Sequence, residues 1–152
     1  MRVVVTGARD WGDEDLIREA LAKLEPPVTL IHGDCRGADR LAGKIGEQLG
    51  FEVIAVPASW QVTDDTPRWA IRHYRDRAYD VRAGGLRNTT LLDMGPELVL
   101  AFHDDPGPVG GPGGTRDCMD KTLKRGIALA HTSHANGTLY YPGRPRSLFD
   151  TA

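Results

Sequence analysis

Short apolar segments alternate with amphipathic segments along most of this chain, and this alternation restricts the fold more than any other feature of the sequence. The spacing of apolar residues predicts helices over residues 13–24, 38–49, 86–94 and 115–125. Between them lie short runs rich in Val, Ile and Leu that predict strands: Val3 to Thr6, Val28 to His32, Phe51 to Val56, Leu98 to Phe102 and Ile127 to Ala130. Strand–helix alternation produces a parallel sheet that helices cover on both faces. We therefore predict a Rossmann-like α/β three-layer sandwich whose central, mainly parallel sheet has about five strands.

Two segments fall outside this alternation. The 152-residue chain is 40% hydrophobic and 26% charged, which fits a single globular domain, and we assign residues 1–130 to it. Residues 57–85 are too long for an ordinary connection and form an insertion, which we expect to pack over the ligand site or between subunits. Residues 131–152 form a C-terminal tail, in which Asn136-Gly137 is typical of a hairpin turn.

Composition excludes several classes of protein. The chain has 19 Lys and Arg against 21 Asp and Glu, so it lacks the basic excess of most nucleic-acid-binding proteins. It contains neither an apolar segment of ~20 residues nor a secretory leader, so we expect a cytoplasmic protein without membrane contact. Cys35 and Cys118 are too few for a disulfide framework or a zinc site, and His131 and His134 lack further ligands nearby in the sequence. We expect neither a metal nor a tightly bound cofactor.

The loop after the first predicted strand contains Gly7, Arg9 and Asp10. It lacks the second and third glycines of the dinucleotide fingerprint G-x-G-x-x-G, and the chain has no G-x-x-x-x-G-K-[ST] phosphate loop. A nicotinamide dehydrogenase and a P-loop ATPase are therefore disfavoured.

The loop after the second strand runs directly into a helix. Its glycines free the backbone just before a helix N-terminus, where unpaired N–H groups attract an anion. Two readings of Asp39 stay open, because it is suited either to a ribose hydroxyl or to capping its own helix. The ligand-binding candidates in this loop are Gly33, Asp34, Arg36, Gly37, Ala38 and Asp39.

Eight of the nine residues from Pro106 to Gly114 are Gly or Pro, which makes this segment a loop. It also leads into a helix, for which Thr115 is a natural N-cap. An N-cap does not need several preceding glycines, whereas a backbone that approaches a phosphate does. We therefore add Gly113, Gly114, Thr115 and Arg116 to the ligand-binding candidates.

Three short motifs together resemble the SLOG superfamily, in particular its YspA-type bacterial and phage proteins. They are the segment from Gly33 to Asp39, Leu86-Arg87-Asn88, and Gly113-Gly114-Thr115. The superfamily includes the Lonely Guy nucleotide hydrolases and the DNA-processing protein DprA. The resemblance covers roughly residues 1 to 130 and implies a Rossmann-like fold with a site for a nucleotide or nucleotide-derived ligand. It adds Arg87 and Asn88 to the site.

The chain departs from the Lonely Guy pattern P-G-G-x-G-T-x-x-E where that pattern has its glutamate. That position is Cys118 here, and a glycosidic hydrolase needs a carboxylate. A nucleotide N-glycosidic hydrolase or transferase therefore stays an alternative to a binding protein, with Asp117, Asp34 and Arg87 as its catalytic candidates. We interpret Cys35 and Cys118 as small packed thiols rather than reactive ones.

The insertion mixes arginines with aromatic residues, as a surface for single-stranded nucleic acid does. Aspartates in the same stretch dilute its charge, so DNA binding similar to that of DprA is a further alternative, and a lid that closes on the ligand is another. As partners we expect a nucleotide-type small molecule and, from the superfamily resemblance, a second copy of the chain.

Overall fold

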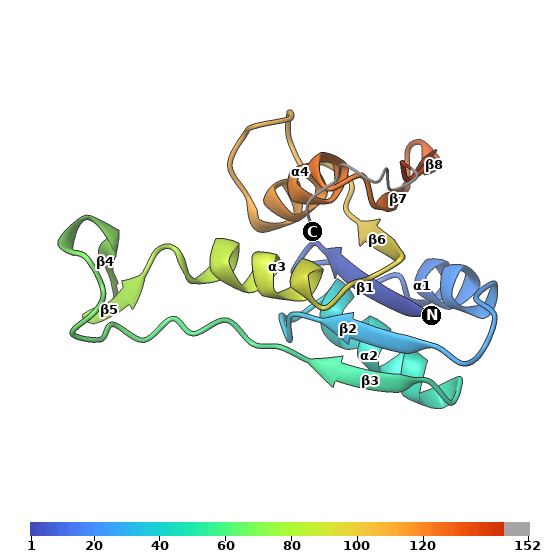
Figure 1. Cartoon of the computed structure of the whole chain (residues 1–152), viewed down its shortest axis with the longest axis horizontal. Helices are drawn as coiled ribbons and strands as arrows, with labels where there is room; N and C mark the ends of the chain where they lie inside the picture. Colours follow the sequence, from blue (N-terminus) through green and yellow to red (C-terminus); the bar gives the residue numbers. More distant parts are fainter. Residues whose placement is uncertain (145–152) are drawn as a thin grey trace.

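The computed structural model describes residues 1–144 and confirms the α/β architecture (Figure 1). Six strands form one sheet in the order β3-β2-β1-β6-β7-β8, one strand more than the sequence predicts. Neighbouring strands from β3 to β7 pair in parallel, and β8 pairs antiparallel with β7. The strands are β1 (Arg2–Gly7), β2 (Thr29–His32), β3 (Glu52–Ala55), β6 (Leu98–Phe102), β7 (Ala128–Ser133) and β8 (Gly137–Tyr141).

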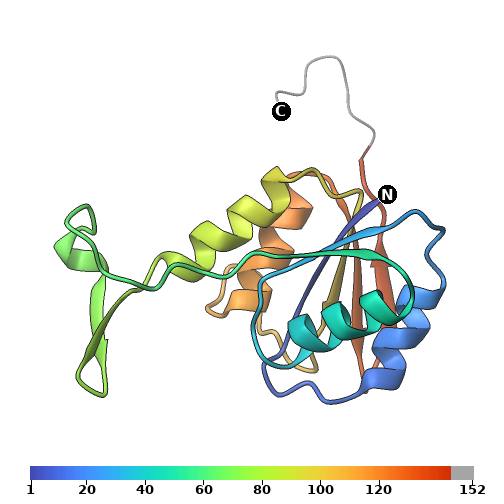
Figure 2. The same cartoon turned by 90° about the horizontal axis from the view of Figure 1, so that it is seen from below.

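Four helices cover the two faces of the sheet. Helices α1 (Glu14–Ala22) and α2 (Ala38–Gln48) lie on one face, and α3 (Ala83–Asp93) and α4 (Gly114–Lys124) lie on the other (Figure 2). Helix α1 begins after Asp13, whose Oδ1 accepts a hydrogen bond from the Leu16 amide at 3.2 Å. None of the helices within residues 1–144 combines the length and the apolar character needed to cross a bilayer.

Successive residues of β1 supply both halves of the core. Val3 and Val5 pack toward α1 and α2, whereas Val4 packs toward α3 and α4, and all three are fully buried. A strand covered on both faces is a continuous apolar run rather than an alternating one. This explains why the run from Val3 to Val5 is readable as a central strand from the sequence.

The path of the chain has a topological switch point at the carboxyl ends of β1 and β6, and we call this part of the sheet edge the crevice. From β1 the chain moves outward to β2 and β3, and it then crosses to β6 and β7 on the other side of β1. The connections that follow β1 and β6 therefore leave toward opposite faces, and ligands of open α/β sheets bind at such a point. The loops of residues 8–13 and 103–113 border this crevice.

The C-terminal part of the described chain adds to the sheet. Strand β7 continues to Ser133, so a division at residue 130 falls inside a strand. The turn at residues 134–136 joins β7 to β8, with Ser133 opposite Gly137. Residues 145–152 of the tail lie outside the described residues.

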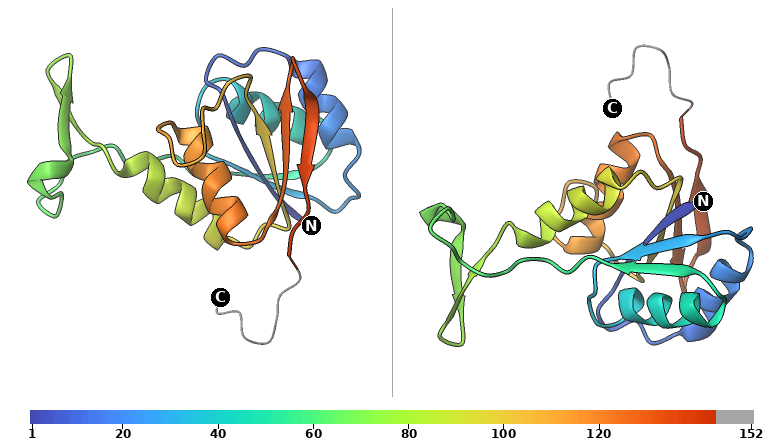
Figure 3. Two further views of the ribbon diagram at one scale, coloured as in Figure 1. Left: turned by 90° about the horizontal axis from the view of Figure 1, so that it is seen from above. Right: turned by 60° about the horizontal axis from the view of Figure 1, so that its bottom comes forward.

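The insertion differs from the expectation that it packs over the site of its own chain. It contains a short 3-10 helix (Arg68–Ala70) and a hairpin of β4 (Ile71–Tyr74) and β5 (Arg77–Asp80), and α3 begins at Ala83 rather than Leu86. Figures 1 and 3 show that residues 57–82 stand off the body as an arm. The hairpin has no apolar face to bury against the body, since only Asp80 of its strand residues is buried.

Candidate functional site

Arg87 of α3 joins the helix to the loop that follows β2. Its guanidinium donates hydrogen bonds through Nη1 to the Gly33 carbonyl and through Nη2 to Cys35 Sγ, the latter at 3.7 Å. A Cβ on Gly33 would lie 2.2 Å from Arg87 Nη1. Gly33 is therefore needed so that this arginine can lie against the loop backbone.

The next residue, Asn88, joins the same helix to the start of α4. Its Nδ2 donates to the Gly114 carbonyl and to Asp117 Oδ2, each at 3.0 Å, and its Oδ1 accepts from Arg87 Nε at 3.1 Å. Asn88 is only 2% exposed. Arg87 and Asn88 thus connect the two glycine-containing loops in one hydrogen-bonded chain, and they bring together Gly33, Gly114 and Asp117.

The loops after β1 and β2 touch through their backbones. The Ala38 amide donates to the Ala8 carbonyl at 3.1 Å, and the Ala8 amide donates to the Phe102 carbonyl at 2.9 Å. A Cβ on Gly37, whose φ is +82°, would lie 2.3 Å from the Ala8 oxygen. A Cβ on Gly7 would lie 2.3 Å from the Phe102 oxygen. Gly7 and Gly37 therefore serve close backbone contact, and the Ala38 amide is already occupied by protein.

Asp39 is buried at this edge of the sheet, with 5% of its surface exposed. Its Oδ2 accepts hydrogen bonds from the amides of Gly33 at 3.0 Å and Cys35 at 3.3 Å, so this oxygen shapes the loop. Burial raises the pKa of Asp39 to about 6, although the two amides and the nearby Arg87 and Arg9 oppose that rise. Within residues 1–144, its Oδ1 has no hydrogen-bond partner.

Helix α4 has no side-chain cap. It begins one residue earlier than predicted, so Gly113 is the N-cap residue and Thr115 lies buried in the first turn. Gly113 has a φ of +112°, which disfavours residues with a side chain. Because Gly113 has no capping oxygen, its helix has amides in the first turn that no side chain satisfies.

Arg116 points back into the glycine loop instead of toward the crevice. Its Nε donates to Asp120 Oδ1 at 2.8 Å and its Nη1 donates to the Gly107 carbonyl at 3.3 Å. Asp120 Oδ2 also accepts from the Gly110 amide at 2.8 Å. The pair of buried Arg116 and half-buried Asp120 therefore fixes the conformation of the loop.

The remaining predicted residues are two exposed arginines, one exposed aspartate and two aspartates that pair with cations. Arg9 and Arg36 are exposed, and no carboxylate of the described chain lies within ion-pair distance of either. Asp10 is also exposed. Asp34 pairs with Arg40 Nε at 3.2 Å, and Asp117 pairs with Lys121 Nζ at 3.0 Å.

A sequence model of the YspA, cpYpsA-related SLOG family matches residues 1–62. The Gene 61 protein of Mycobacterium phage D29 is 32% identical over 137 residues, which cover 84% of this chain and 93% of the phage protein. The chain belongs to the YspA, cpYpsA-related SLOG family.

DNA processing protein A (DprA) from Streptococcus pneumoniae has the same fold, with a TM-score of 0.62 at 15% identity. The match covers 98% of this SLOG chain, which spans about half the length of that protein. The SLOG match over residues 1–62 includes the loops after β1 and β2. The residues from α3 and α4 lie beyond that match.

Two features of this SLOG chain bear on its chemistry. Cys118 is fully buried in the core between the sheet and α3 and α4, and burial raises the pKa of its thiol to about 12. Its thiol therefore stays protonated at neutral pH. Cys35 is half-buried. Its Sγ contacts Arg87 and also lies 3.8 Å from the carbonyl oxygen of Gly33.

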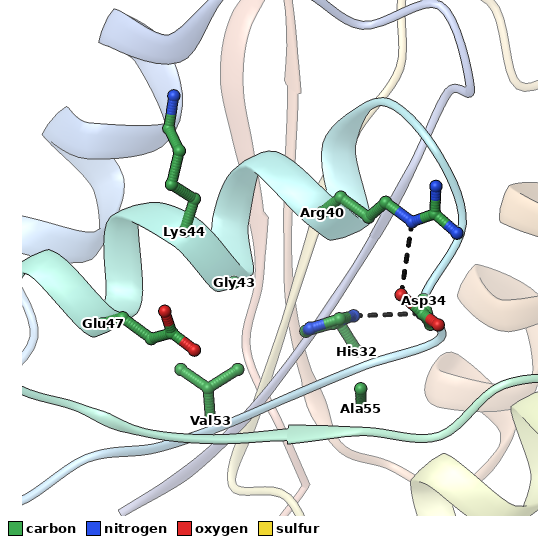
Figure 4. Close-up of a pocket in the computed structure, with 8 residues that line it drawn as sticks. All are labelled: His32, Asp34, Arg40, Gly43, Lys44, Glu47, Val53 and Ala55. Carbon is green, nitrogen blue, oxygen red and sulfur yellow. Dashed lines mark hydrogen bonds and ion pairs between the residues drawn. The ribbon is translucent and has the colours of Figure 1, made fainter.

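A hollow of about 330 Å³ that was not predicted from the sequence lies between α2 and the strands β2 and β3 (Figure 4). Its defining residue is His32, which is 5% exposed and whose Nδ1 accepts from the Asp34 amide at 3.0 Å. Burial lowers the pKa of His32, which keeps the ring neutral. Gly43 is the sequence signal, because a Cβ there would lie 2.7 Å from His32 Nε2. The lining residues are His32, Asp34, Arg40, Gly43, Lys44, Glu47, Val53 and Ala55.

A second missed feature joins three loops at the same sheet edge. His134 contacts Asp104 through Nδ1 and Asp13 through Nε2, each at 2.9 Å, and its ring stacks on Trp11 with centroids 4.7 Å apart. The hydrogen bonds to Asp104 and Asp13 raise the pKa of His134. His134 therefore connects these three loops as a structural clamp.

Proposed function

We propose that the carboxyl edge of the sheet binds a nucleotide or a nucleotide-derived small molecule. The observation that carries the proposal is the chain of contacts from Gly33 through Arg87 and Asn88 to Gly114. It holds two glycine-containing loops around one crevice, at the switch point of the sheet where such folds bind ligands. Membership of the SLOG family, which is associated with nucleotide-derived ligands, supports the same class of ligand.

The phosphate and the ribose of a nucleotide match different residues of the proposed site. A phosphate fits the uncapped amides at Gly113 to Thr115, with Arg9 and Arg36 as exposed cations at the neighbouring loops. The start of α2 is a poorer phosphate site than the sequence suggests, because the Ala38 amide already donates to Ala8. The unpartnered Oδ1 of Asp39 suits a ribose hydroxyl.

Hydrolysis of an N-glycosidic bond is the second candidate function. It is favoured by Asp39, a buried carboxyl at the crevice whose pKa of about 6 suits transfer of a proton near neutral pH. Asp117 and Asp34 are weaker candidates, since each already binds a neighbouring cation. Binding without turnover leaves the ligand intact, whereas hydrolysis releases the free base. One experiment therefore distinguishes the two functions.

The test is incubation with nucleoside mono- and diphosphates, NAD and ADP-ribose, followed by native mass spectrometry. We expect the protein to retain at least one of these molecules. Arg87→Ala removes the link between α3 and the β2 loop, and we expect at least about tenfold weaker retention. Arg125→Ala is the matched control, because Arg125, which follows α4, pairs with Asp93 at the end of α3 and away from the crevice.

Four outcomes are informative. Retention of an intact ligand by wild type and Arg125→Ala, but not by Arg87→Ala, supports binding. Release of free base that Asp39→Asn abolishes supports hydrolysis. No retention and no base release for any member of the panel contradicts the proposal, as does equal retention by Arg87→Ala and Arg125→Ala.

A further inference from the structure

The arm of residues 57–82 presents a surface that the proposed nucleotide site does not use. Its hairpin lies far from the crevice in every view (Figures 1, 2 and 3). A two-stranded hairpin alone is marginally stable in water. Here a small cluster holds its base: Trp60 packs edge-on against Tyr79 with centroids 6.3 Å apart, and the Asp80 amide donates to the Trp60 carbonyl at 2.8 Å. The tip beyond this cluster is exposed.

One face of the hairpin carries two arginines and two tyrosines. Arg72 pairs with Tyr79, and Tyr74 pairs with Arg77, in the antiparallel register. Directly opposed residues share a face, and so do residues two apart on one strand. The four side chains therefore form one face on which arginine and tyrosine alternate diagonally. We call it the Arg–Tyr face.

The carboxylates of the hairpin do not lie on this face. Asp80 is on the opposite face, is 6% exposed, and pairs with Arg82 at 2.9 Å. Asp76 lies in the turn. Of the residues that the structure describes, no carboxylate lies within ion-pair distance of four arginines of the arm, namely Arg68, Arg72, Arg75 and Arg77. The dilution of charge that the sequence suggests therefore does not apply to the Arg–Tyr face.

Two aromatic rings of the arm are exposed, whereas Tyr79 is half-buried against Trp60. Tyr74 is 65% exposed, and neighbouring Trp69 in the 3-10 helix is 66% exposed. Arg75 lies over the Tyr74 ring at 5.3 Å, and Arg72 Nη1 is fixed by the Trp69 carbonyl at 2.7 Å. Fixed guanidinium groups beside open aromatic rings match a strand whose bases are unpaired, since the rings stack on bases while the cations bind phosphates.

We infer that the Arg–Tyr face binds single-stranded nucleic acid. Charge complementarity between unpaired arginines and phosphates favours this occupant over an apolar peptide. The tyrosines favour a single strand over a duplex, because paired bases do not offer their faces to a side chain. The inference is independent of the nucleotide site, because the hairpin stands off the body as an arm (Figure 2).

The test measures fluorescence anisotropy of labelled dT and U oligonucleotides of about 20 nucleotides, beside a duplex of equal length. We expect the full chain to bind a single strand more tightly than the duplex and to lose affinity as salt rises. Tyr74→Ala should weaken binding about tenfold, and Tyr74→Phe should restore it because the ring remains. Arg77→Ala should weaken binding and reduce the salt dependence. Lys124→Ala, an exposed lysine of the body, removes the same charge and should have little effect.

Several results would overturn the inference. They are no binding of either single strand at low salt, equal affinity for strand and duplex, and unchanged affinity of Tyr74→Ala and Arg77→Ala. If these variants instead dissociate an oligomer in light scattering while nucleic-acid binding is unchanged, the face contacts a second copy and the inference is wrong. Nucleotide retention by the same variants shows whether the body site is intact, so failure here is separable from failure of the proposed function.

Discussion

Asp39 illustrates how a single side chain combines a structural and a chemical role. Its Oδ2 holds the Gly33 and Cys35 amides in place, while burial opposes ionisation of the same carboxyl. The protein therefore retains a carboxyl that is costly to ionise at the edge where the ligand is proposed to bind. A side chain that is neutral at all pH values would avoid the free-energy cost of ionising a buried group.

This cost predicts a pH dependence of stability. The pKa of Asp39 is raised to about 6 from an ordinary value of 3.8, so between these values the folded protein binds a proton that the unfolded chain has released. The contribution of Asp39 is fully present below pH 4 and is lost as pH rises through 6. Its size is about 3 kcal/mol, since each unit of pKa difference corresponds to about 1.4 kcal/mol.

Asp39→Asn should flatten that dependence, because an amide cannot ionise and its oxygen can still accept from the two loop amides. Urea unfolding at several pH values between 4 and 7 measures the effect. Asp15→Asn, at an exposed position of α1, controls for loss of a carboxylate elsewhere. An unchanged slope for Asp39→Asn would contradict the account of this residue.

Residue types at the site were predictable, but their partners were not. The resemblance to the SLOG superfamily placed Arg87 and Asn88 beside the glycine loops, and the structure brings these residues together. The sequence does not reveal that Arg116 pairs with Asp120. Side chains four residues apart on a helix can pair with each other or bind a ligand, and the packing around both of them decides which occurs. Burial of Asp39 likewise depends on packing between distant elements.

At the scale of the elements, the close approach of the β1 and β2 loops depends on Gly37. Gly37→Ala would add a Cβ 2.3 Å from the Ala8 oxygen at a φ of +82°. We expect a loss of about 3 kcal/mol in the free energy of unfolding and weaker nucleotide retention. Gly12→Ala is the matched control, since no atom lies within 4 Å of its Cβ position, and it should stay within about 1 kcal/mol of wild type. Equal stability of the two variants in urea would contradict this role for Gly37.

The elements differ in how readable they are from sequence. Strands β1 and β6 are continuous apolar runs, and α1 has both its periodic residues and its Asp13 cap. The arm hairpin carried no such signal, because polar residues occupy both faces of β4 and β5. Its turn uses Arg75 and Asp76, both with positive φ, in place of the Asn-Gly or Asp-Gly sequence that normally identifies such a turn.

At the scale of the whole molecule, the chain combines a compact body with a projecting arm. The body follows from local sequence patterns together with the right-handed strand–helix–strand rule, which leaves few possible arrangements of parallel strands. The direction of the arm does not follow from them, because an exposed hairpin has few packing constraints. The two parts have separate proposed ligands, a small nucleotide at the crevice and a nucleic-acid strand on the arm.

The most direct test of the central claim is amide hydrogen exchange of the full chain with and without the nucleotide retained in native mass spectrometry. We predict slower exchange in three loops: residues 7–10, 33–39 and 110–117. Exchange in β7 and β8 should not change. Protection confined to residues 40–55, which border the hollow beside His32, or no protection in the three loops, would contradict the account.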